Sequence, residues 1–331
     1  MPASIAAARR GLAYRCDMRV TAARLVQHGQ PLQVEELELG EPGEQEVILE
    51  VAYSGVNPVD MYGALGLVAP DAPVPRTLGT EGAGIADGRP VMVRGYGLGT
   101  IRDGLWATAA IVPRGALIDV PAGVDLRAAA AMGIAGVTAW RTVTEVARVS
   151  ADDTVLVLGA KGGVGSIVVS LAHSIGATVA GQTGEADNHD WITAHGADYV
   201  VVADADGLAD ALADLRPTVV FDGLGGGFTG AAIEVLQPYG RLVLYGASAG
   251  PEGLVPLRTL YRKSITIRSY AGLMATDEDL AAAIRQALPA VAEGRMAVPI
   301  DSALPLKQVN DAFERIRQRT VRGKLVLDTR S

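Results

Sequence analysis

Residues 155–165 read Val155-Leu156-Val157-Leu158-Gly159-Ala160-Lys161-Gly162-Gly163-Val164-Gly165. The apolar start predicts a buried strand, the glycines predict a tight turn, and the apolar residues 167–175 predict a helix. In this order of elements, Gly162 lets the backbone approach a phosphate and Gly165 lets the helix pack closely on the strand. Amides at the helix N-terminus then bind the anion.

The glycine turn predicts a dinucleotide site made by Gly159, Ala160, Gly162, Gly163, Val164 and Gly165. The amide of Gly163 is expected beside the pyrophosphate, so that a side chain there would occupy space the phosphate oxygens need. Ala160 breaks the strict three-glycine pattern. The alternative is therefore a glycine-rich turn between strand and helix that binds no ligand.

The remainder of the chain extends this unit in both directions. Strand candidates at 178–181, 199–202, 218–221, 241–245 and 264–269 have the continuous Val, Leu and Ile content of a parallel sheet covered on both faces. Before residue 120 the runs are short and β-branched, at 20–26, 46–53, 90–94 and 107–112. Residues 125–149 predict one or two helices. After residue 272 come a helix at 277–292, an extended stretch at 298–304, a helix at 306–317 and a strand at 324–327.

This pattern predicts a doubly wound dinucleotide-binding domain between two pieces of a β-rich domain. The expected divisions are a disordered tail at 1–17, the β-rich catalytic domain at 18–123, the dinucleotide domain at 124–271 and the second catalytic part at 272–331. A cleft between the domains would hold the ligands.

Composition narrows the function. The 331 residues suffice for two cores, and the net charge of −8 without a dense basic run argues against a nucleic-acid partner. The single cysteine, Cys16, excludes an intramolecular disulfide and favours the cytoplasm. No apolar run approaches the roughly 20 residues that span a bilayer, so no membrane partner is expected.

The end of the second predicted strand bears on cofactor choice. An acidic residue there would hold the ribose 2′-hydroxyl of NADH and repel the 2′-phosphate of NADPH. Gln182 and Thr183 are neutral, which favours NADPH. Glu185 lies close enough to support the opposite choice.

Several segments together carry a family resemblance. They are Ser54-Gly55-Val56-Asn57-Pro58-Val59-Asp60-Met61-Tyr62, Leu78-Gly79-Thr80-Glu81-Gly82-Ala83-Gly84, Gly136-Val137-Thr138-Ala139-Trp140, the glycine turn, Val220-Phe221-Asp222 with Gly225-Gly226, and Arg322-Gly323-Lys324-Leu325-Val326-Leu327. In order and spacing the chain resembles the zinc-independent, quinone oxidoreductase-like branch of the medium-chain dehydrogenase/reductase superfamily, with its zinc-type alcohol dehydrogenase-like fold. The resemblance implies an α/β chain in which a Rossmann-type domain is inserted in a GroES-like catalytic domain. It also implies a homodimer.

The resemblance implies roles for individual residues. Asn57 and Thr138 would line the nicotinamide end, Tyr245 and Gly246 would lie against the nicotinamide, and Arg319 would lie near the phosphates. Tyr62 would donate to the substrate and Asp60 would orient a neighbour. The alternatives are a turn-forming Asn57 before Pro58 and a packed core Tyr62.

The resemblance also implies where a metal would be found. Zinc ligands of relatives would fall at Asn57 and Thr80, neither of which is a competent ligand, so no metal is expected.

Four features depart from the family pattern. Gly66-Leu67-Val68 lacks a tyrosine, Asn188 replaces a lysine, Ala203 replaces a tyrosine, and the connection from Gly84 to Arg89 is short. The second and third weaken the expectation of strict NADPH selectivity.

Without a metal, hydride delivery to a conjugated acceptor such as a quinone or enone is the favoured chemistry, because hydrogen-bond donors can stabilise the distant oxygen. An enoyl-thioester reductase of lipid or polyketide metabolism and a non-catalytic NADP-binding protein remain alternatives.

Overall fold

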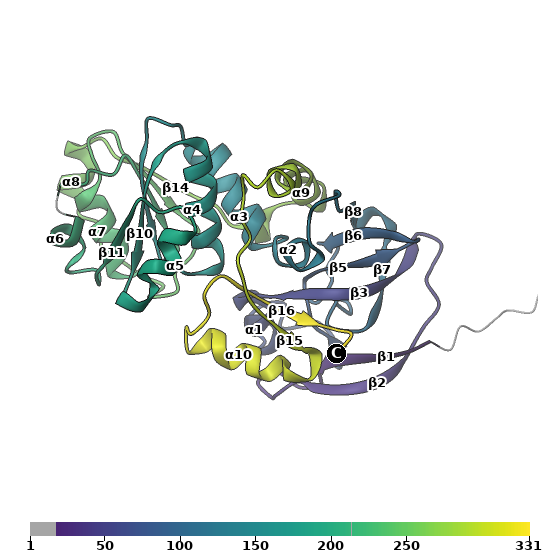
Figure 1. Cartoon of the computed structure of the whole chain (residues 1–331). Coiled ribbons are helices and arrows are strands. Elements are labelled where there is room, and N and C mark those ends of the chain that lie inside the picture. Colours follow the sequence, from purple (N-terminus) through teal and green to yellow (C-terminus); the bar gives the residue numbers. More distant parts are fainter. Residues whose placement is uncertain (1–17, 213) are drawn as a thin grey trace, which may run out of the picture.

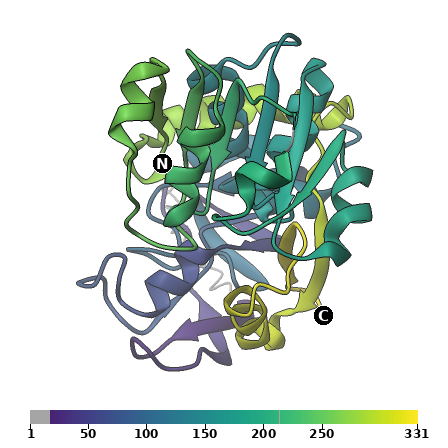
Figure 2. The same cartoon turned by 90° about the vertical axis from the view of Figure 1, so that its left-hand side faces the viewer.

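The computed structural model describes residues 18–212 and 214–331, which form a sheet-and-helix part and a β-rich part (Figure 1). The disordered tail predicted at 1–17 lies outside the described residues. In the β-rich part the C-terminal segments, in yellow, lie beside the N-terminal strands, in purple (Figure 2). The chain therefore leaves this part and returns to it.

Six parallel strands form the sheet of the first part, in the order β11-β10-β9-β12-β13-β14. Strand order reverses between β9 and β12, the switch point where doubly wound sheets bind ligands. The predicted Rossmann-type fold class is confirmed. The strands are β9 Thr154–Leu158, β10 Thr178–Thr183, β11 Tyr199–Val202, β12 Val219–Asp222, β13 Arg241–Leu244 and β14 Thr266–Ser269.

Side chains of β9 alternate between two cores. Val155 and Val157 pack in the core that includes Ile167 of α4, whereas Leu156 and Leu158 pack in the core that includes Ile233 of α7. This explains the continuous apolar run, because both faces of the strand are covered. The helices of this part are α4 Gly163–Ile175, α5 His189–Ala194, α6 Leu208–Leu212, α7 Gly227–Val235 and α8 Leu257–Arg262, with the short η3 Ala186–Asn188.

The β-rich part contains two sheets, one ordered β15-β16-β3-β5-β6-β8, with β7 also paired to β3, and one ordered β2-β1-β4. Antiparallel pairing of β16 with β3 places Leu325 opposite Val56. The strands are β1 Met18–Leu25, β2 Gln33–Leu39, β3 Glu46–Val56, β4 Arg76–Thr77, β5 Glu81–Ala86, β6 Arg89–Arg94, β7 Ala109–Pro113, β8 Leu117–Asp119, β15 Ile300–Pro305 and β16 Lys324–Asp328.

The short connection after Gly84 is a two-residue hairpin turn. Asp87 and Gly88 link β5 to β6, with φ angles of 48° and 71°. Positive φ at both central residues matches the twist of a two-residue hairpin, and Asp-Gly is a favoured pair there. Two residues therefore suffice to connect β5 and β6.

The segment predicted as one or two helices is interrupted. It contains α2 Leu126–Ala131, α3 Ala135–Arg141 and the π-helical turn η2 Thr142–Ala147, which ends at Arg148 with φ 53°. The remaining helical elements are α1 Pro58–Ala64, η1 Arg114–Ala116, η4 Gly272–Met274, α9 Asp277–Ala292, η5 Leu306–Gln308 and α10 Val309–Arg317. Over residues 18–212 and 214–331, no helix combines the length and apolar character needed to cross a membrane.

Candidate cofactor site and polar centre

The glycine turn after β9 leads directly into α4. Gly159 has φ 68°, and the amide of Gly162 donates to the carbonyl of Gly159 at 2.9 Å. A Cβ on Gly165 would overlap the Gly159 carbonyl, so only a hydrogen fits between helix and strand. Gly165 thus has the close-packing position that its sequence context predicts.

The N-terminus of α4 is open to an anion. Its N-cap residue, Gly162, forms no side-chain cap, and α4 itself supplies no acceptor for its first amides, at Gly163, Val164 and Gly165. These amides carry the positive end of the helix dipole at the switch point of the sheet. The residues present fit a bound pyrophosphate.

Gly163 faces a different neighbour from the one expected. A Cβ at this position would lie 2.9 Å from Cδ of Lys324 and 3.4 Å from the carbonyl oxygen of Gly323. The prediction that a side chain here would fill phosphate space is therefore wrong in direction, because the Cβ would point at the start of β16. The glycine allows the β-rich part to approach the turn.

Gln182 and Thr183, at the end of β10, are both buried. The Gln182 amide accepts from the Gly159 amide at 2.9 Å and donates to the Ala203 carbonyl at 2.6 Å. The Thr183 hydroxyl oxygen accepts from Asn188 at 3.1 Å. Gln182 thus supports the glycine turn and Thr183 supports the loop after β10, and direct cofactor contact by either side chain stays a prediction.

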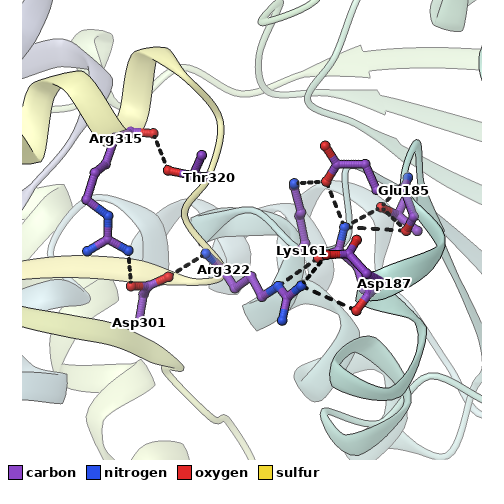
Figure 3. A network of polar contacts seen from close by, with 9 residues as sticks. Lys161, Glu185, Asp187, Asp301, Arg315, Thr320 and Arg322 are labelled. Atoms are coloured by element: carbon purple, nitrogen blue, oxygen red, sulfur yellow. Dashed lines mark hydrogen bonds and ion pairs between the residues drawn. The ribbon is translucent and has the colours of Figure 1, made fainter.

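A network of charged side chains surrounds the end of β10 (Figure 3). Lys161 Nζ lies 2.5 Å from Glu185 Oε2, and Arg322 Nη2 lies 2.7 Å from Asp187 Oδ2. Buried Asn188 joins the pairs, donating to Glu185 Oε2 at 3.0 Å and accepting from Arg322 Nε at 2.8 Å. The hydrogen bonds from Lys161 and then Asn188 lower the pKa of Glu185.

Sequence reasoning missed Lys161 and Arg322 as charged site residues. Both lie in motifs that carry the family resemblance, the glycine turn and the Arg322-Gly323-Lys324 run. Their place in these motifs is the sequence signal that could have identified them.

Residues 319–323 cross the carboxyl edge of the parallel sheet. Arg319 donates to the Ser248 carbonyl after β13 at 2.6 Å, and the Gly323 amide donates to the Lys161 carbonyl after β9 at 2.8 Å. Arg322 reaches the loop after β10. One loop of the β-rich part therefore contacts three strand ends. A position of Arg319 beside the cofactor phosphates stays a prediction.

A buried polar centre lies where β16 pairs with β3. Lys324 Nζ donates to the Asn57 side-chain oxygen, to Glu81 Oε1 at 3.1 Å and to the Val56 carbonyl at 3.1 Å. The Asn57 amide donates to the same Glu81 oxygen at 2.6 Å, and the Ile134 amide donates to Glu81 Oε2 at 2.7 Å. Every hydrogen-bonding group of Glu81 is thus satisfied away from water.

Asp60 lies beside this centre. Its carboxylate accepts from the Asn57 amide at 2.9 Å and from the Thr80 hydroxyl at 2.9 Å. Burial and then the nearby Glu81 carboxylate raise the pKa of Asp60 to about 6. Asp60 therefore fixes the backbone of Asn57, and its role in orienting a neighbour during the reaction stays a prediction.

The centre does not suit zinc. Asn57 and Thr80 each bond to a carboxylate, and the Lys324 ammonium already supplies the positive charge opposite Glu81. Within the described ranges, no cluster of three His, Cys, Asp or Glu side chains could hold a metal ion. The absence of zinc stays a prediction that rests on these donor types.

The hydroxyl groups of the predicted residues Tyr62 and Thr138 differ in whether they are free to bind a ligand. Tyr62 is 43% exposed, so it is not a packed core tyrosine, and its hydroxyl has no partner among the described residues. The Thr138 hydroxyl donates to the Ile134 carbonyl at 2.8 Å within its own helix. Tyr62 is therefore the freer donor.

Tyr245 and Gly246 follow β13. The Tyr245 ring packs over Gly223, where a Cβ would lie 2.6 Å from it, and a Cβ on Gly246 would lie 2.8 Å from the Gly223 carbonyl oxygen. Burial and then Asp222 raise the pKa of Tyr245. This tyrosine stays neutral and helps to form the sheet edge.

Two cavities lie elsewhere. One of about 310 Å³ is lined by residues such as Val20, Leu37 and Arg102, and one of about 520 Å³ lies around Leu212 and Leu236. Neither is lined by the glycine turn or the polar centre.

Comparison with known proteins agrees with this geometry. Residues 195–327 match a family model described as zinc-binding dehydrogenase. The chain is 28% identical over 322 residues to quinone oxidoreductase 1 of Escherichia coli, covering 91% of this chain and 97% of the relative.

Solved structures have the same fold. One described as an NAD-dependent alcohol dehydrogenase has a TM-score of 0.84 and 26% identity, covering 93% of this chain and 99% of its own. An Escherichia coli quinone oxidoreductase complexed with NADPH has a TM-score of 0.79 and 26% identity, with the same coverage.

Proposed function

We propose that this chain, which belongs to the quinone oxidoreductase-like branch of the medium-chain dehydrogenase/reductase superfamily, is an NADPH-dependent reductase of quinones or other conjugated carbonyl compounds. One observation carries the proposal. Residues 319–324 contact the open phosphate edge through Gly323 and the polar centre through Lys324. The glycine turn and the polar centre are thus neighbours, which supports a cofactor bound at the turn beside the polar centre.

NADPH, when bound, supplies the hydride. The chain's residues would orient the cofactor through the α4 amides and fix its distance from the polar centre through Lys324. The Tyr62 hydroxyl, which has no partner among residues 18–212 and 214–331, is the proposed donor to the substrate oxygen that gains charge. Asn57 is held by Glu81 and Lys324. We therefore propose that it both lines the site and stabilises it.

NADPH should bind more tightly than NADH. Lys161 and Arg322 place two cations near the end of β10, and a 2′-phosphate offers them an additional anion. Fluorescence titration of each reduced cofactor, in the same buffer and salt, measures the two dissociation constants. Tighter binding of NADH would assign Glu185 to the ribose and reverse the preference.

One assay identifies the substrate class. NADPH consumption is measured with a quinone, an enone, an enoyl thioester and a simple aldehyde. The proposal expects turnover of the first two. Turnover of enoyl thioesters alone would favour the thioester reductase, and cofactor binding without any turnover would favour a non-catalytic NADP-binding protein.

The chain should form a homodimer through β14. All four residues of this strand are exposed, and its outer edge has no strand partner among the described residues. Exposed apolar side chains lie nearby in sequence, at Tyr261, Leu273 and Met274. An unpaired, exposed strand edge beside apolar groups favours pairing with a second copy.

Light scattering after size exclusion should give about twice the chain mass of 34.2 kDa. Ile267→Asp in β14 should shift the protein to monomer, whereas Val202→Asp on the opposite edge strand β11 should leave the dimer intact. A monomeric unaltered protein, or dissociation by both variants alike, would contradict this interface.

We place the protein in the cytoplasm. Cys16 is its only cysteine, which suits a reducing compartment, and NADPH-dependent reduction suits it as well. The proposed partners are small conjugated carbonyl compounds, with no nucleic acid and no membrane.

A further inference from the structure

We propose that Glu185 and Asp187 compete with the cofactor's 2′-phosphate for Lys161 and Arg322, so that cofactor choice is set by an exchange of ion pairs between the two parts of the chain. The inference rests on the proposed function, because it assumes that a dinucleotide binds at the glycine turn. It concerns only the ribose that carries adenine. The ligand group is a phosphate monoester.

The position of the network supports this assignment. In a doubly wound fold, the residues about 20 positions after the glycine turn face the adenosine ribose. Glu185 and Asp187 stand there, and Lys161, within the turn, reaches Glu185 at 2.5 Å (Figure 3). A phosphate on that ribose would therefore meet an existing pair of opposite charges.

Arg322 brings the second cation from the β-rich part. Its backbone amide donates to Asp301 Oδ2 at 2.8 Å, and Asp301 is held by Arg315 at 2.5 Å. Its guanidinium then extends to Asp187 at 2.7 Å and to Asn188 at 2.8 Å. The fork of donors that a guanidinium presents is suited to phosphate oxygens.

The exposure of the four side chains indicates which groups can leave. Glu185 and Asp187 are 61% and 71% exposed, whereas Lys161 and Arg322 are 20% and 37% exposed. The acids form the outer layer and can turn into water at little cost, because exposed ion pairs are weak. The Gly323–Lys161 hydrogen bond joins the two backbone segments that carry the cations, so both cations stay beside the loop after β10.

Charge balance explains a limited selectivity. The two cations and two acids sum to zero, so a 2′-phosphate gains the cations only by displacing the acids. A cofactor without that phosphate leaves the pairs intact. The unaltered chain should therefore accept both cofactors and prefer NADPH by a modest factor.

Variants that remove both acids, or one cation at a time, test the exchange. The double change Glu185→Gln with Asp187→Asn should tighten NADPH binding about tenfold, because the cations no longer have competing acids. Lys161→Gln and Arg322→Gln should each weaken NADPH binding about tenfold. None of these should tighten NADH binding, and the two cation variants should change it less than about twofold.

Titration by fluorescence and calorimetry measures both dissociation constants, and thermal unfolding checks that each variant is folded. Arg317→Gln is the matched control, since Arg317 is an exposed arginine of α10 that pairs with Glu314. It should change neither constant. Adenosine 2′,5′-bisphosphate against adenosine 5′-monophosphate repeats the comparison without nicotinamide.

The outcomes distinguish a failure of the proposed function from a failure of the ion-pair exchange. If the unaltered chain binds neither NADPH nor NADH, the proposed function fails. If both bind but the ratio of their constants is the same in all folded variants, the ion-pair exchange is wrong and the proposed function stands. Equal weakening of NADPH and NADH by Arg322→Gln would also overturn the exchange, because it would assign Arg322 to closure of the site in general.

Discussion

Lys324→Met should lower the free energy of unfolding by about 3–5 kcal/mol. The Lys324 and Glu81 side chains are 4% and 0% exposed, and their charges are paired at 3.1 Å. Methionine keeps much of the aliphatic stem but removes the ammonium. Glu81 then keeps a buried negative charge without its cation, and the Val56 carbonyl and Asn57 oxygen lose a donor.

Urea unfolding at neutral pH measures this loss. Adding Glu81→Gln to Lys324→Met should restore part of the stability, because the unpaired charge is then removed as well. Lys307→Met, in an exposed lysine of η5, should change stability by no more than about 0.5 kcal/mol. A loss below about 1 kcal/mol in the single variant, or a double variant less stable than the single one, would show that the pair is not a buried charge pair in solution.

Local sequence predicted the Rossmann part well because its signals are local. Strand β11 matches its predicted bounds of 199–202, and β9 lies where the apolar start of the glycine turn predicts a strand. Outside this part, α9 also matches its predicted bounds of 277–292. Four strands of the β-rich part, β2, β4, β5 and β8, were missed. Residues of β2 are mostly exposed and include three glutamates, and β5 contains two glycines, so neither has an alternating apolar pattern.

The candidate site was predicted only in part, for a different reason. Asn57, Asp60 and the glycine turn stand in recognisable motifs. The sequence does not show that Glu81 and Lys324 are the partners of Asn57. These two residues are 243 positions apart and meet only because β16 and β5 both pair with β3. Likewise, Arg322 and Asn188 are 134 residues apart. Residue types can indicate a site, but contacts between distant strands determine which charges are paired.

Gly163→Val should weaken NADPH binding about tenfold or more and also lower stability by about 1–3 kcal/mol. The new Cβ would lie 2.9 Å from Cδ of Lys324, and the two methyl groups of valine would need further space. Lys324 cannot simply move aside, because its ammonium bonds to Asn57, Glu81 and Val56 inside the protein. Either the lysine leaves its partners or α4 moves, and with α4 move the amides that would bind the pyrophosphate.

Two measurements on this variant distinguish three roles for Gly163. Gly40→Val is the control, since a Cβ on Gly40 has no neighbour within 4 Å, and it should change neither stability nor affinity. If Gly163 only makes room for phosphate, affinity falls and the unfolding free energy is unchanged. If it only lets the two parts pack, stability falls while the folded fraction binds NADPH as before. We expect both quantities to fall, because Lys324 links the glycine turn to the buried centre, and either single result would contradict that link.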